Sequence, residues 1–88
     1  MTRRINARQL AVYKRYRGDE DGLARAGTAS EKALMADVKW SSITDAIQRA
    51  SIVRRGLADE AFERELNEFV RENFEDGIGI ADLVLADP

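Results

Sequence analysis

The segment DEAFERELNEFVRENFEDG, residues 59–77, carries the clearest hydrophobic pattern in the chain. Its apolar residues recur three or four positions apart, with charged residues between them, which is the pattern of an amphipathic helix. Asp59 can cap the start of such a helix, and Gly77 can end it. The pattern therefore predicts a helix from about Glu60 to Glu75 and favours an all-α fold. The apolar stripe consists of Phe62, Leu66, Phe69, Val70 and Phe74.

The segment before it predicts a second helix, from about Ser42 to Arg55. Gly56 follows two arginines, and basic side chains in a last turn complement the negative end of the helix dipole. Ser41 or Ser42 can cap the start, and Trp40 before them predicts a hydrophobic staple to Ala46 or Ile47. The stripe consists of Ile43, Ala46, Ile47, Ala50 and Val53.

The N-terminal third predicts a helix from Thr2 to Arg17 with a basic back, ended by Gly18. Residues 19–27 are rich in glycine and predict a loop with at most one or two helical turns. Thr28 and Glu31 have the spacing of a capping box, which begins a short helix with Leu34, Met35 and Val38 turned inward. The inner face of the first helix comprises Ile5, Gln9, Val12 and Tyr16, with Tyr13 beside them.

The apolar tail, residues 78–85, can form a short strand or a last helical turn. A single strand would have no partner, so a short helix from about Ile80 to Leu85 is favoured. Together the segments predict one domain over residues 1–88, a compact bundle of four to five short helices. A chain of 88 residues buries only about 60–65% of its unfolded surface, so dimerisation is one way to complete such a core.

The composition argues against an enzyme or a metal protein. The chain has no cysteine and no histidine, which removes thiolate nucleophiles, the commonest general base and the commonest transition-metal ligand. Asp19 to Gly22 resembles part of a calcium loop, but an EF-hand counted from Asp19 would need an oxygen ligand where Leu23 stands and a bidentate glutamate where Ser30 stands. We therefore expect no catalytic residues, no metal site and no cofactor.

The composition also bears on location. Apolar residues make up 44% of the chain and charged residues 34%, which is typical of a folded domain and not of a disordered one. No apolar run approaches the roughly 20 residues of a membrane span, and no signal peptide is evident. We expect a cytoplasmic, bacterial protein without a membrane partner, and Arg17-Gly18-Asp19 is then a helix end and not an adhesion motif.

The charge is strongly polarised along the chain. Residues 1–17 hold six basic residues and no acid, whereas residues 57–88 hold ten acids and two arginines. Arg4, Arg8 and Arg15 fall on one face of the predicted first helix and can contact phosphate or an acidic partner. Binding of nucleic acid is therefore the alternative function, although a pI of about 5.1 disfavours it. The two ends of the chain can equally attract each other.

The function favoured by the sequence is non-enzymatic binding of protein, either a larger partner or a second copy in a homodimer. Tyr13, Tyr16 and Ile52 are the candidate contact residues, because Ile52 lies opposite the apolar stripe of its helix and the tyrosines lie near the chain end. The alternative is that these side chains fill the core of one chain.

Overall fold

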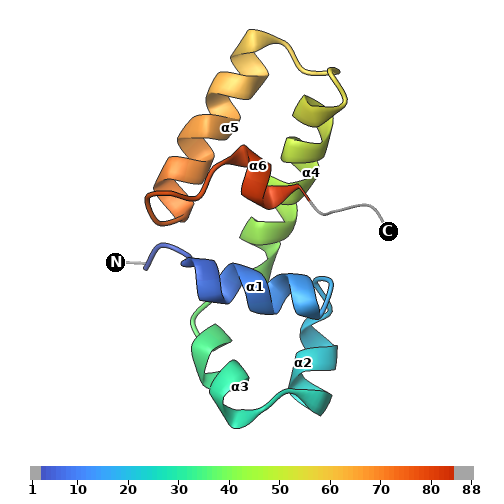
Figure 1. The fold of residues 1–88 in the computed structure, drawn as a ribbon, viewed down its shortest axis with the longest axis vertical. Helices are drawn as coiled ribbons and strands as arrows, with labels where there is room; N and C mark the ends of the chain where they lie inside the picture. The colour runs from blue at the N-terminus through green and yellow to red at the C-terminus, as the bar shows by residue number, and fades with distance from the viewer. Residues whose placement is uncertain (1–2, 85–88) are drawn as a thin grey trace.

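The fold is built around one helix, α4 (Trp40–Arg54), which contacts the helices on either side of it. In the computed structural model, which describes residues 3–84, α4 packs against α5 (Glu60–Asn73), α6 (Ile80–Leu83) and α1 (Ala7–Arg15). Below α1 lie α2 (Glu20–Ala26) and α3 (Ala29–Met35), so that α1 crosses the middle of the molecule (Figure 1). The described part of the chain is therefore all-α, as predicted, and has six helices where four to five were expected.

The core follows the predicted stripes of the long helices. The side chains of Ile43, Ala46 and Ala50 on α4 have no solvent exposure, and neither has Leu66 on α5. The two alanines let neighbouring helices approach the axis of α4 closely, because they project only one carbon. Leu83 of α6 is equally buried, so the apolar tail closes the core as a helix, as favoured from the sequence. Leu85 lies outside the described residues.

The first helix is shorter than predicted. It begins at Ala7 and not at Thr2, because Asn6 and Gln9 form a capping box: each side chain accepts the backbone N–H of the other residue, at 2.8 and 2.9 Å. Of the residues before Asn6 that the structure describes, Arg3 and Arg4 have no regular secondary structure, and Ile5 forms an isolated bridge with Phe74. Ile5 pairs with the end of α5, donating to Asn73 O at 2.8 Å and accepting from Glu75 N at 2.8 Å.

One further prediction about the helix boundaries is wrong, and two agree with the structure. Residues 20–26 form the helix α2, which at seven residues is within the one or two turns expected, and the side chain of Asp19 caps it by accepting the N–H of Gly22. The predicted hydrophobic staple at Trp40 is wrong, because Trp40 lies inside α4. The centre of its ring lies 5.4 Å from the centre of the Tyr13 ring. The capping box of Thr28 and Glu31 is confirmed by both of its hydrogen bonds.

Every helix in residues 3–84 is too short or too polar to span a lipid bilayer. The helices instead form a flattened body, 41 × 34 × 19 Å, with α2 and α3 at one end and the loop between α4 and α5 at the other (Figure 1). The two ends of this body therefore present surfaces built from different helices.

The end of α1 provides a test of how tightly the core is packed. Gly18 has a φ of +76°, and a Cβ added there would lie 2.8 Å from Tyr13 Oη. Gly56 has a similar φ of +72°, but nothing lies within 4 Å of its Cβ position. Gly56→Ala should therefore lose about 1 kcal/mol of stability from backbone strain alone. Gly18→Ala should lose at least about 1 kcal/mol more, because the buried Tyr13 has to move. Urea unfolding of both variants measures the difference, and equal losses would contradict this packing.

Candidate protein-binding surface

The most exposed large apolar side chain in residues 3–84 follows the end of α4. Gly56 N donates to Val53 O at 3.0 Å and Leu57 N donates to Ile52 O at 3.2 Å, with Gly56 in the left-handed region. These bonds form a Schellman motif, which commonly brings the residue after the glycine beside the residue five positions earlier. The backbone of Leu57 is thereby held to that of Ile52, and 71% of Leu57 remains exposed.

Two half-buried apolar residues accompany Leu57. Ile52 near the end of α4 and Phe62 near the start of α5 are partly exposed, and neither packs against the core formed by residues 3–84. Other half-buried apolar side chains, such as Phe69, do pack against it. Ile52, Leu57 and Phe62 lie at the end of α4, in the loop and in the first turn of α5, and we call them the α4–α5 surface. It lies at the end of the molecule opposite α2 and α3 (Figure 1).

Charged residues of opposite sign flank this surface. Arg54 and Arg55 lie at the end of α4, and Glu60 and Glu63 lie in the first turn of α5. All four are exposed. Each pair also complements the dipole of its own helix, since basic groups favour a C-terminus and acidic groups an N-terminus. The α4–α5 surface therefore has basic residues at the end of α4 and acidic residues at the start of α5.

Of the predicted contact residues, Tyr13 lies in the core. Its exposure is 5%, and its hydroxyl lies 2.6 Å from Thr44 Oγ1 on α4. This hydrogen bond and the packing of its ring on Trp40 join α1 to α4. Tyr13 is therefore not part of the surface of the described chain, whereas Ile52 is.

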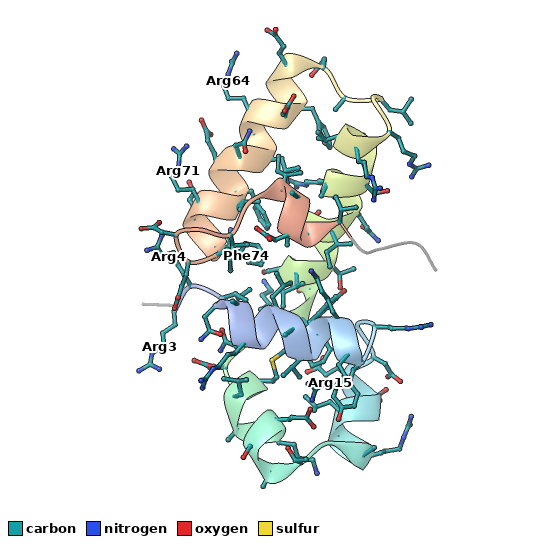
Figure 2. The ribbon with its side chains drawn as sticks, viewed as in Figure 1. Arg3, Arg4, Arg15, Arg64, Arg71 and Phe74 are labelled. Atoms are coloured by element: carbon teal, nitrogen blue, oxygen red, sulfur yellow. The ribbon has the colours of Figure 1, made fainter. Side chains whose placement is uncertain are left out.

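Tyr16 and Arg15 are held by one carboxylate. Tyr16 Oη donates to Glu31 Oε1 at 2.8 Å, and the Arg15 guanidinium pairs with Glu31 Oε2 (Figure 2). The hydrogen bond from the Thr28 backbone lowers the pKa of Glu31 most, and Tyr16 and Arg15 lower it further. The hydrogen bond between Tyr16 and Glu31 also raises the pKa of the Tyr16 phenol. This cluster fastens α1 to α3.

The three predicted phosphate-binding arginines do not share a helix face. Arg4 precedes α1 and reaches the other end of the chain, where its Nη1 lies 3.1 Å from Asp76 Oδ1 and donates to Arg71 O at 3.3 Å (Figure 2). Arg15 is paired with Glu31, as described above. Arg8 is exposed and has no ion-pair partner within residues 3–84. The opposite charges of the two chain ends thus meet in part within one molecule.

A cleft of about 730 Å³ lies between the N-terminal segment, the end of α3 and the turn after α5. Its lining mixes Arg3 and Arg4 with Asp37, Glu75 and Asp76, and most of these side chains extend into solvent. Within residues 3–84, no buried side-chain nitrogen or oxygen lacks a hydrogen-bond partner. In the same part of the chain, no group of three or more acidic side chains is placed to hold a metal ion.

The exposure of Leu57 could not be predicted from the sequence, because Leu57 belongs to neither of the two helical patterns. It follows Gly56 and precedes the cap at Asp59, so helix periodicity does not apply to it. The sequence feature that could have drawn attention to Leu57 is its place directly after Gly56, where an apolar residue commonly contacts the preceding helix. Phe62 was expected in the core, since its spacing matches the stripe of α5.

Comparison with known proteins adds no relative, because no protein-family model, no curated protein and no solved structure matches this chain.

The Glu31 cluster makes a prediction about pH. Because the pKa of Glu31 is lowered on folding, its carboxylate stabilises the fold above the unfolded pKa, and the effect is lost as the pH falls through the folded value. Glu31→Gln should thus be less stable than wild type at pH 7, with the difference shrinking as the pH falls through the acid range. Urea unfolding across pH measures it. Glu65→Gln, at an exposed position, is the control and should show no such trend. A constant difference for Glu31→Gln would contradict the prediction.

Proposed function

We propose that this protein is a small non-enzymatic module that binds protein through the α4–α5 surface. The observation that carries the proposal is the 71% exposure of Leu57, in a helix–loop–helix junction where two further apolar side chains, Ile52 and Phe62, do not pack against the core. Single exposed apolar residues are ordinary, but a group of them rimmed by charges is typical of a docking surface.

The local backbone favours binding at this position. The Schellman motif ends α4 with two backbone hydrogen bonds, and the side chain of Asp59 accepts the N–H of Phe62 at 2.8 Å to begin α5. Leu57 thus lies in a short connection fixed at both ends. Because the backbone around Leu57 is already ordered, a partner that covers Leu57 does not have to order it. The entropic cost of binding is therefore low.

The energetic scale supports a modest but measurable contact. Full burial of a leucine side chain contributes roughly 1.5–3 kcal/mol, and Ile52 and Phe62 add the area that they still expose. A charge placed at the centre of such a contact has to be desolvated without a partner, which weakens binding strongly. Leu57 is therefore the position at which one substitution tests the whole surface.

Two features support a role without catalysis. The sequence has no histidine or cysteine, so the side chains that most often act as bases and nucleophiles at neutral pH are absent. The carboxyl with a shifted pKa, Glu31, is kept ionised by structural hydrogen bonds between α1 and α3. A general acid would need the opposite shift.

Nucleic-acid binding, the alternative, has less support. Arg4 and Arg15 form ion pairs within the chain, which a phosphate backbone would have to displace. The outer side of α5 carries several glutamates around Arg64 and Arg71, which point away from the body (Figure 2). This acidic side repels a polyanion.

Affinity capture from a lysate of the source organism tests the proposal. Tagged wild type should retain the same partner as Ser30→Asp, an exposed control that adds the same charge at the far end of the molecule, on α3. Leu57→Asp should lose that partner while keeping wild-type stability to within about 0.5 kcal/mol, because its side chain is largely in water. An untagged copy of this chain counts as a partner. Capture that does not depend on Leu57, or no captured protein together with no self-association of the purified chain, would overturn the proposal.

A further inference from the structure

We propose that the partner of the α4–α5 surface is a second copy of this chain, joined by a twofold axis that passes close to Leu57. This inference rests on the proposed function and names its partner. In the dimer, Arg54 and Arg55 of one copy face Glu60 and Glu63 of the other. The two Leu57 side chains meet at the centre, beside Ile52 and Phe62.

The charges flanking the surface carry the inference. Arg54 and Arg55 lie at the end of α4 and Glu60 and Glu63 in the first turn of α5, and all four are exposed. A uniformly acidic partner would be repelled by the glutamates, and a uniformly basic partner by the arginines. A surface with both signs is matched by a copy of itself in which the two helix ends are exchanged.

The geometry of the two helices allows this exchange. α4 ends and α5 begins at the same end of the molecule, joined by a short loop (Figure 1). A twofold axis perpendicular to the plane of the two helices brings the end of α4 in one copy opposite the start of α5 in the other. The negative end of one helix dipole then faces the positive end of another, so the backbone favours the same pairing as the side chains.

The size of the contact determines how tight the dimer is. The end of a two-helix hairpin is narrow, so the buried area falls in the class below about 1,200 Å², which is typical of weak and transient contacts. The net charge of −2 per chain causes little repulsion between copies. We therefore expect a dissociation constant in the micromolar range and a population of dimer that rises with concentration.

Sedimentation velocity of the full chain from about 10 µM to about 1 mM tests the dimer directly. Wild type and Ser30→Asp should change from monomer to dimer over this range, and Leu57→Asp should remain a monomer. A wild type that is monomeric throughout would overturn the inference. A dimer that persists in Leu57→Asp would also overturn it, because the copies would then meet elsewhere.

Charge reversal tests the twofold arrangement. Arg54→Glu with Arg55→Glu, or Glu60→Lys with Glu63→Lys, places like charges opposite each other, and each double variant should dimerise at least about tenfold more weakly. An equimolar mixture of the two double variants restores opposite charges at both contacts and should recover the dimer. If the mixture remains as weak as its components, the proposed pairing is wrong. Circular dichroism of each double variant shows whether its helices are intact.

These outcomes are separable from those of the capture experiment. If wild type is monomeric while capture of another protein still depends on Leu57, the second copy is excluded and the proposed function stands. If the dimer depends on Leu57 while capture of other proteins does not, the α4–α5 surface serves self-association, and the wider docking role is excluded.

Discussion

The burial of α4 on several sides is the constraint on which the rest of the structure depends. It contacts α1, α5 and α6, and Ile43, Ala46 and Ala50 on it have no solvent exposure. A helix can be covered in this way only where its side chains are small enough for neighbours to approach. The two alanines meet that condition, and the larger residues that fill the space come from the surrounding helices. A larger residue at Ala46 or Ala50 would push the neighbouring helices away from α4.

Polar contacts hold α1, α3 and the N-terminal segment in place. The hydroxyl of Tyr13 meets Thr44 on α4, and Glu31 ties the end of α1 to the start of α3. The N-terminal segment is held by backbone bonds of Ile5 and by the pair of Arg4 with Asp76. The opposite charges of the chain ends thus serve in part to hold one chain together. This use engages Arg4, while Arg8 stays exposed.

The proposed docking surface arises from the shortness of the helices. No further element lies beyond the loop between α4 and α5 in the described chain (Figure 1), so the apolar residues at the ends of both helices are left partly in water. Leu57 is the extreme case, because a Schellman motif fixes its backbone while nothing covers its side chain. A small chain that exposes such a group can lower its free energy by association, which links the thin core to the proposed function.

The sequence by itself determined the all-α class, the stripes of α4 and α5 apart from Phe62, and the capping box at Thr28, because each depends on residues within one or two turns of each other. It favoured a helix for the tail only because a strand would lack a partner, and the structure has a helix at Ile80–Leu83. The sequence also placed Ile52 opposite the stripe of α4. Contacts between distant residues decided the rest. Pairing of Ile5 with the end of α5 leaves Arg4 outside α1, and packing on Trp40 draws Tyr13 into the core. The exposure of Leu57 and Phe62 depends on what the other helices fail to cover, which no local pattern contains.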